Sequence, residues 1–279
     1  MKLQLHSLTI AVILLLGSSA VAAEDYCFGC HSVQEGMSLI YKNDIHYGNG
    51  LSCADCHGGD PKINDMNLSK APGTGFRPRA ARATMPDYCG RCHSDATYMA
   101  RYNPKLPVDQ LELYNKGVHG RQLAAGQTKS AQCTDCHSVH DTRAVTDPRS
   151  PASPERITET CAKCHKATAD AFRDSPHGHE FTFDRRPGCV TCHDNHDTEP
   201  ATLSLLTDKD NGCARCHKPD SDGYKAAVQI AQELATLEAA GPDAKDALAR
   251  ARVAVHTFDP AAVKLAADSA PPGTRPSRN

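Results

Sequence analysis

The segment CTDCHSVH, from Cys133 to His140, contains a five-residue pattern that recurs along the whole chain. Cys133 and Cys136 stand three residues apart, and His137 follows the second cysteine directly. Seven copies of this Cys-x-x-Cys-His pattern account for all fourteen cysteines. The cysteine pairs are, in chain order, Cys27 and Cys30, Cys53 and Cys56, Cys89 and Cys92, Cys133 and Cys136, Cys161 and Cys164, Cys189 and Cys192, and Cys213 and Cys216. The histidines that close the seven motifs are His31, His57, His93, His137, His165, His193 and His217.

The spacing within each motif suits the covalent attachment of a c-type haem. Residues i and i+3 of a helical turn lie on one face, so both sulfurs can reach the two vinyl groups on one edge of a porphyrin. The histidine that follows is then placed to bind the iron as its proximal ligand. The sequence therefore predicts seven covalently bound haem c groups, each held by two cysteines and one histidine.

Two other uses of paired cysteines explain less of the pattern. A Cys-x-x-Cys pair can bind zinc or act as a redox dithiol, but neither role requires a histidine directly after the second cysteine. A disulfide framework would also use an even number of cysteines, but it would leave the seven motif histidines unexplained. We therefore favour haem c over both alternatives.

Apart from His6 in the predicted signal peptide, seven further histidines match the seven axial positions that these irons would leave open. Three of them stand close before a glycine, between an odd-numbered and an even-numbered motif, as in His119-Gly120 and His177-Gly178. Methionine is the alternative second ligand, but the methionines show no repeated placement. We predict that all seven histidines are distal iron ligands: His46, His119, His140, His177, His179, His196 and His256.

The order of motifs and histidines indicates a repeated two-haem unit, which is typical of duplication. The three units occupy residues 27–57, 89–140 and 161–196. His140 and His196 come three residues after a motif histidine, where the bound macrocycle would block them from the same iron. We therefore expect each of them to bind a different haem, and we expect Asp141 and Asp197 beside them to orient an imidazole.

The chain divides into four predicted regions by composition. The first region, residues 1–23, has a lysine, a short apolar run and small residues before a cleavage site, as in a secretory signal peptide. The apolar run is too short to cross a membrane, so we expect a protein that does not span the membrane after the signal is removed. The regions are a signal peptide at 1–23, a multihaem domain with three two-haem units and a seventh haem at 24–220, a helical segment at 221–268 and a disordered tail at 269–279.

The composition points to a mostly α fold with extensive loops, a haem-filled core and little or no β-sheet. Leu, Ile, Val and Phe are about one residue in seven after residue 23, and tryptophan is absent, which is poor for a globular domain. Seven apolar macrocycles would supply the missing buried surface, and we expect the chain without them to be largely unfolded. In the tail, Asp243 and Asp259 are predicted to cap helices.

A basic stretch without a motif spans residues 61–86 and contains Arg77, Arg79 and Arg82 among glycines and prolines. Two interpretations stay open for it: contact with haem propionates or an acidic partner, or a solvated loop. Nothing in the chain resembles a nucleic-acid-binding module.

The arrangement resembles the bacterial multihaem c-type cytochromes that carry respiratory electrons outside the cytoplasmic membrane. The similarity covers about residues 25–217 and rests on CADCHGGDP, YCGRCHSD, GVHGRQL, CTDCHSVHD, DPRSP and TCAKCH. It implies His/His-ligated, low-spin haems and electron relay between redox partner proteins. It also implies a quinol-oxidising membrane cytochrome b complex as donor, and a location in the periplasm or at the cell surface.

Three functions fit these predictions, and the relay is favoured. A relay needs every iron to be six-coordinate, so we expect an electron carrier and no catalytic residue. A multihaem oxidoreductase of the nitrite or hydroxylamine type would need one open iron, which would follow if His179 or His256 were not a ligand. A polymeric cytochrome filament would need a ligand donated to the next subunit.

Overall fold

The structure is a computed structural model that describes residues 25–34, 36–179, 187–200, 202–208 and 212–271. The predicted signal peptide at 1–23 and residues 272–279 of the predicted disordered tail lie outside the described residues. Within the described ranges the chain forms α-helices, short 3-10 helices and turns, and no strand. The prediction of a mostly α fold with extensive loops is therefore confirmed.

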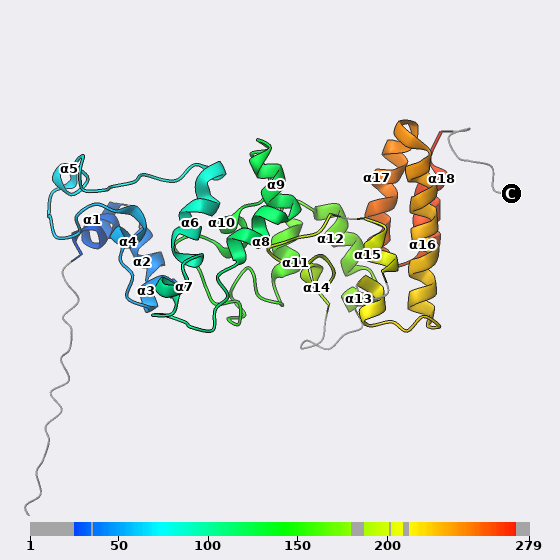
Figure 1. The fold of residues 1–279 in the computed structure, drawn as a ribbon, viewed down its shortest axis with the longest axis horizontal. Coiled ribbons are helices and arrows are strands. Elements are labelled where there is room, and N and C mark those ends of the chain that lie inside the picture. The colour runs from blue at the N-terminus through cyan, green and yellow to red at the C-terminus, as the bar shows by residue number, and fades with distance from the viewer. Residues whose placement is uncertain (1–24, 35, 180–186, 201, 209–211, 272–279) are drawn as a thin grey trace, which may run out of the picture.

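Short helices follow one another through the motif-bearing part of the chain (Figure 1). In the first half these are α1 (Tyr26–Gln34), α2 (Met37–Tyr41), α3 (Ile45–Gly48), α4 (Cys53–His57), α5 (Met66–Ser69), η1 (Arg82–Thr84), α6 (Met85–His93), α7 (Ala96–Met99), α8 (Gln110–Lys116), α9 (Val118–Ala124) and α10 (Cys133–His137). In the second half they are α11 (Ile157–Ala162), α12 (Lys166–Arg173), α13 (Pro176–His179), α14 (Cys189–His193), α15 (Ser204–Thr207) and η2 (Gly212–Arg215). The tail adds α16 (Asp222–Ala239), η3 (Gly241–Ala244), α17 (Lys245–Ala254), η4 (Val255–Thr257) and α18 (Pro260–Asp268).

The second, fourth and sixth motifs have the same local structure. Each is a single helical turn of five residues that begins at the first cysteine and ends at the histidine: α4, α10 and α14. In α4 the Ser52 side chain accepts from an amide of the turn while Asp55 accepts from the Ser52 N–H, so both ends of the cap are satisfied. The residue after each histidine has a positive φ, which stops the helix at the iron ligand.

The odd-numbered motifs are placed differently. The first lies within α1, the third closes α6, and the fifth starts near the end of α11 and runs on toward α12. The seventh lies in and just after η2. The two-haem repeat in the sequence therefore corresponds to an alternation between one-turn helices and motifs carried by other helices.

The molecule is elongated, and the chain advances along its long axis (Figure 1). Helices α1 to α4 lie at one end, α8 to α11 lie in the middle, and α16 to α18 lie at the other end. Motifs that are neighbours in sequence are consequently neighbours along this axis.

The tail, where the sequence predicted a helical segment, forms a three-helix bundle of α16, α17 and α18. Its core contains Leu237 and Val263, which are fully buried, together with a series of buried alanines. Asp259 caps α18 as expected. The prediction that Asp243 caps the second tail helix was wrong, because Asp243 lies inside η3 and α17 begins after it without a side-chain cap.

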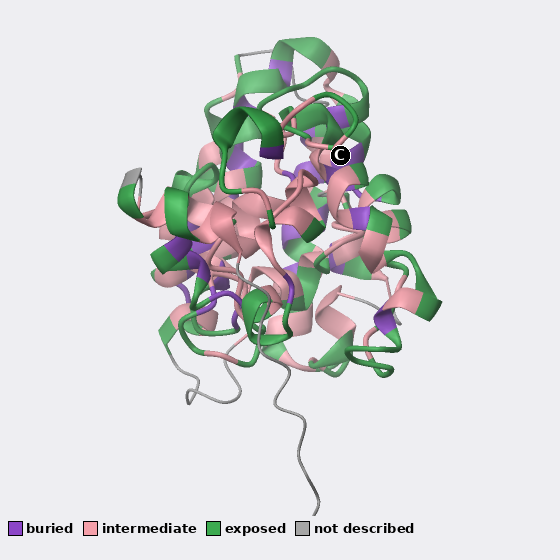
Figure 2. Cartoon of the chain, turned by 90° about the vertical axis from the view of Figure 1, so that its left-hand side faces the viewer, coloured by how far each residue is buried: buried purple, intermediate pink, exposed green. Residues whose placement is uncertain are grey.

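This bundle, with Leu206 of α15, is the buried apolar cluster of the described residues. In the motif-bearing part, buried apolar residues such as Leu123 and Phe172 are scattered, and much of the interior is only partly buried (Figure 2). A body with this packing lacks the apolar contacts of an ordinary domain.

Candidate functional site

Six of the seven motif histidines face a histidine from another part of the chain. In every pair the centroids of the two imidazole rings lie 5.9–6.3 Å apart. The planes are nearly parallel in two pairs, at 17° and 22°, and nearly perpendicular in one, at 81°. The pairs are His57 with His140, His93 with His46, His137 with His196, His165 with His119, His193 with His256, and His217 with His177.

This separation fits a metal ion held between two imidazoles. Two metal–nitrogen bonds of about 2 Å, with about 1 Å from each nitrogen to its ring centre, span about 6 Å. The residues therefore fit an iron with one motif histidine and one non-motif histidine as its two axial ligands.

The hydrogen bonds of three of these imidazoles leave the Nε2 atom free for a metal. His46 Nδ1 lies 2.8 Å from a carboxylate oxygen of the buried Asp44. His57 Nδ1 lies 3.2 Å from the carbonyl oxygen of Arg77, and His256 Nδ1 lies 3.1 Å from that of Arg252. An imidazole whose Nδ1–H donates to a carboxylate or a carbonyl is fixed in the tautomer and orientation that binds metal through Nε2.

Burial lowers the pKa of seven of the paired imidazoles, which favours their neutral form. It lowers the pKa of motif histidines such as His137 and His193, and a neighbouring imidazole lowers it further. Among the non-motif histidines, burial likewise lowers the pKa of His119, His140, His196 and His256. Neutral imidazole is the form that binds a metal ion.

The partners of His140 and His196 are distant motif histidines. His140 lies against His57 and not against His137, the motif histidine three residues before it. His196 lies against His137 and not against His193. Each of these histidines thus reaches back to the even-numbered motif of the preceding two-haem unit.

Chain segments that carry non-motif histidines are paired at three places, which we call junctions. The first junction joins residues 44–46 to 140–142: the Ile45 N–H donates to the Thr142 carbonyl at 2.8 Å, and the Thr142 N–H donates to Asp44 at 2.7 Å. It brings His46 next to His140.

The second junction repeats the first with residues 117–119 and 196–198. The Val118 N–H donates to the Thr198 carbonyl at 2.9 Å. A Cβ on Gly117 would lie 2.7 Å from the His196 carbonyl oxygen, so this close approach requires glycine. His119 is thereby held next to His196.

The third junction joins residues 176–177 to 256–258 and replaces the hydrogen bond with an aromatic contact. Proline at position 176 has no N–H to donate. Instead the Phe258 ring packs edge-on against His177, with centroids 4.2 Å apart. The tail thus brings the segment of His256 beside that of His177. His256 takes the place that His140 has in the first junction and His196 has in the second.

Each junction provides a facing imidazole to each of two successive motifs. The first places one imidazole opposite His57 and one opposite His93, and the second does the same for His137 and His165. The third serves the sixth and seventh motifs. The two-haem units of the sequence are therefore interlocked, because each depends on histidines of its neighbours.

Two predicted ligands are not brought together with a partner. Among the described residues, no imidazole lies opposite His31 as one does opposite the other six motif histidines. His179 is exposed on α13, and no described motif histidine faces it. Helices α1 and α13 lie far apart along the long axis, so His179 does not reach His31 within the same chain (Figure 1).

The cysteines of successive motifs lie close enough to interact electrostatically. Such interactions link the first motif to the second, the second to the third, and so on to the seventh. The strongest of these interactions are between Cys89 and Cys133 and between Cys161 and Cys189. The seven motifs therefore form one row in chain order.

Glycines make room for the paired histidines. A Cβ on Gly120 would lie 2.0 Å from the Tyr114 carbonyl oxygen, and one on Gly178 would lie 2.4 Å from that of Phe172. A Cβ on Gly223 would lie 2.4 Å from the His217 ring. At these three positions a side chain would clash with neighbouring atoms, so glycine is required although the backbone is not left-handed.

The alternatives to haem find no support in the arrangement. All fourteen cysteines are free of disulfide bonds. Within the described ranges no three side chains from His, Cys, Asp and Glu gather as a zinc site requires.

Several contacts of the site were not predicted from the sequence. Asp44 binds His46, while the predicted Asp141 pairs with Arg143 at 2.7 Å. Asp44 is the N-cap of α3 and accepts from the His46 N–H; aspartate is a preferred N-cap residue, and this was the available signal for Asp44.

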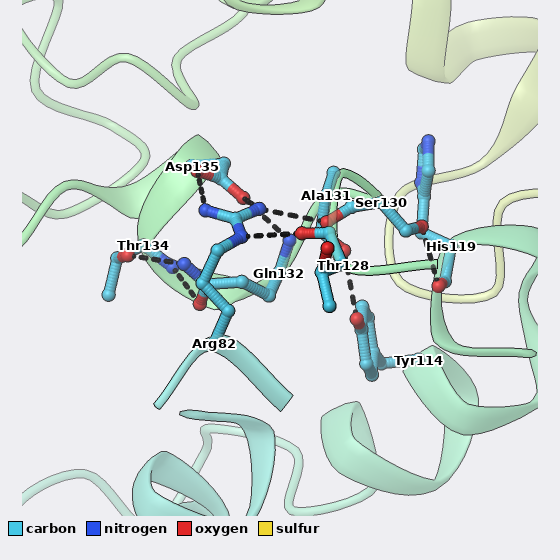
Figure 3. A network of polar contacts seen from close by, with 9 residues as sticks. All are labelled: Arg82, Tyr114, His119, Thr128, Ser130, Ala131, Gln132, Thr134 and Asp135. Atoms are coloured by element: carbon cyan, nitrogen blue, oxygen red, sulfur yellow. Dashed lines mark hydrogen bonds and ion pairs between the residues drawn. The ribbon is translucent and has the colours of Figure 1, made fainter. Parts of the chain in front are cut away.

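The basic stretch is not a free loop, because Arg82 is tied into the fold (Figure 3). Its guanidinium binds both carboxylate oxygens of Asp135, at 2.7 and 3.1 Å, and donates to the carbonyls of Thr128 and Ser130. The Ser130 hydroxyl in turn donates to the His119 carbonyl at 2.8 Å. Arg82 thus connects the third motif's helix to the segment between His119 and the fourth motif.

Comparison with protein families agrees with this geometry. The family model described as cytochrome c3 matches residues 45–148, which include three of the motifs, and a model of the doubled CXXCH motif matches residues 183–222, which include two more. The chain is a multihaem c-type cytochrome. No curated protein and no solved structure matches it.

The multihaem cytochrome is accordingly an electron carrier that binds haem c through its Cys-x-x-Cys-His motifs. None of its described helices has the length and apolar character needed to cross a membrane.

Proposed function

We propose that this cytochrome carries seven haem c groups, six of them with two histidine ligands, and relays electrons along a row that follows the order of the motifs. Haem supplies the redox chemistry, because its iron changes oxidation state without leaving its ligands. The observation that supports the proposal most strongly is the set of six facing histidine pairs along a continuous row of motifs.

The ligand set suits a carrier. Two imidazoles fixed by the surrounding backbone would bind an iron in both oxidation states, and the half-buried His137 and His140, whose pKa burial lowers, would leave no axial position for water. The interlocked junctions fix the neighbouring pairs relative to one another, so successive haems stay in close contact.

The donor and the location follow from the family likeness. We propose that the cytochrome works in the periplasm or at the cell surface, where haem c attachment takes place in bacteria. A quinol-oxidising membrane cytochrome b complex is the proposed donor, and a downstream redox protein is the proposed acceptor.

The order of the row can be tested by attaching the protein to an electrode at either end. Leu39→Cys in α2 and Leu265→Cys in α18 introduce exposed thiols at opposite ends. A second change, Cys133→Ala with Cys136→Ala, removes the fourth haem from the middle of the row. Intact mass verifies seven haems in the parent protein and six in the interrupted one.

We expect every haem of the parent protein to be reduced rapidly from either end, as counted by the charge passed. In the interrupted protein only the haems on the electrode side should be reduced rapidly, three from each end. Rapid reduction of all six haems from one end would contradict a single row, and a parent mass below seven haems would contradict the proposed haem content.

A further inference from the structure

The first motif differs from the other six in what faces its histidine. His31 is the motif histidine without an opposing imidazole among the described residues, while each of the other six has one at 5.9–6.3 Å. His31 still belongs to the row, because it interacts electrostatically with His140, which faces the second motif.

The junctions explain why the first motif is left out. Each junction supplies an even-numbered motif and the odd-numbered motif that follows it, so the three junctions serve motifs two to seven. A ligand for the first motif would come from the histidine–glycine segment of a preceding two-haem unit. The three junctions provide no such segment for the first motif.

The spare histidine does not fill this position. His179 lies on α13, beside the third junction and far along the molecule from α1 (Figure 1). A second copy of the chain has no junction to offer either, because its other non-motif histidines already face motif histidines of their own.

The surroundings of His31 are open to solvent. Cys30, just before His31, is exposed. The Val33 side chain, two residues after His31, is 88% exposed. Met37, which follows on α2, is also exposed. A small molecule can therefore approach this end of the row without displacing a packed core.

We propose that the iron bound by His31 keeps its second axial position open and binds small exogenous ligands of the size and class of carbon monoxide and cyanide. The inference rests on the proposed function, since it assumes a haem at every motif. It gives the electron relay a ligand-binding site at its N-terminal end.

The test is a titration of the purified, fully loaded cytochrome with carbon monoxide after reduction by dithionite. The visible spectrum should show one carbon monoxide bound per chain, with seven haems by mass. Electron paramagnetic resonance of the oxidised protein should show one high-spin iron that cyanide converts to low spin.

Three variants locate the site. Cys27→Ala with Cys30→Ala removes the first haem and should abolish carbon monoxide binding while six haems remain. His256→Ala opens the sixth iron and should raise the stoichiometry to two per chain. His179→Ala should leave the stoichiometry at one carbon monoxide per chain, at low and at high protein concentration.

Failure would have a distinct signature. No carbon monoxide binding at seven haems per chain would overturn the inference but leave the relay intact. Binding that appears only in Met37→Ala would assign the position to that methionine, and binding that appears only in His179→Ala or on dilution would assign it to a second copy; either result overturns the inference. A mass below seven haems would instead refute the proposed function.

Discussion

At the scale of the residue, a second histidine opposite each of six motif histidines decides what the cytochrome can do. Counting histidines in the sequence predicted the set of candidates, but it did not predict the pairs. His57 and His140 are distant in sequence, and their approach depends on the hydrogen bonds of Thr142 with Asp44 and Ile45, which no local pattern reveals. The sequence also could not show that His179 stays apart, since it stands in the same short segment as His177.

Removing one facing imidazole should change one iron. In His140→Ala the iron held by His57 loses its second ligand, so one additional high-spin signal per chain is expected in electron paramagnetic resonance. His179→Ala is the matched control and should leave the spectrum of the parent protein unchanged. An unchanged spectrum in His140→Ala would show that His140 is not an iron ligand.

The glycines beside the ligands should differ in their tolerance of a methyl group. Gly120→Ala places a Cβ against the Tyr114 carbonyl, and the forced shift should lower the free energy of unfolding by about 1–3 kcal/mol. Gly48 comes two residues after His46, and nothing lies within 4 Å of the position of its Cβ, so Gly48→Ala should change the free energy of unfolding by about 0.5 kcal/mol or less. Denaturant unfolding of the holoprotein measures both, and equal effects would contradict the packing described here.

At the scale of the element, the helices serve mainly to position ligands. The sequence predicted the tail helices because their apolar residues repeat with helical spacing and Asp259 caps the last of them. It did not predict that Phe258, with its positive φ, would carry the tail onto α13. This contact joins two segments that are remote in sequence and replaces a hydrogen bond that proline cannot donate.

The tail bundle should hold His256 in place. Leu237→Ala removes a fully buried side chain and should lower the free energy of unfolding by about 2–5 kcal/mol. Because η4 follows α17 directly, loosening the bundle should also expose the sixth iron and add high-spin signal on mild heating. Leu265→Ala, at a position that is 75% exposed, is the control, and a similar loss there would contradict the assignment of the core.

The Arg82 network should contribute a small, pH-dependent stability. Burial acts to raise the pKa of Asp135, but hydrogen bonds from the Arg82 guanidinium and the Gln132 N–H lower it overall. A carboxyl whose pKa is lowered by folding stabilises the fold above its unfolded pKa, and this contribution is lost as the pH falls below about 4. The ion pair is partly exposed, so Arg82→Ala should cost only about 0.5 kcal/mol at neutral pH.

The matched control for this change is Arg79→Ala, at an exposed arginine of the same stretch. Thermal unfolding of both variants across the acid range provides the measurement. The deficit of Arg82→Ala should shrink as the pH falls below about 4, and a deficit that grows there would contradict the role assigned to the ion pair.

At the scale of the whole molecule, the cytochrome is a row of motifs without a conventional core outside its tail. The scarcity of aliphatic residues predicted this, since so few of them cannot fill a domain of this length. The motifs alone predicted haem, and their alternation predicted a two-haem repeat. The sequence could not predict that His140 and His196 each face a motif of the preceding two-haem unit, because this depends on which neighbouring unit each histidine reaches in space.

The central claim is that the irons follow the order of the motifs and that three junctions bind the second to the seventh. The most direct measurement is an experimental structure of the holoprotein that locates iron by its anomalous scattering. The account predicts seven iron positions in one row, with His57 and His140 on the second, His193 and His256 on the sixth, and a single histidine on the first. A branched arrangement, or His140 bound to the same iron as His137, would contradict it.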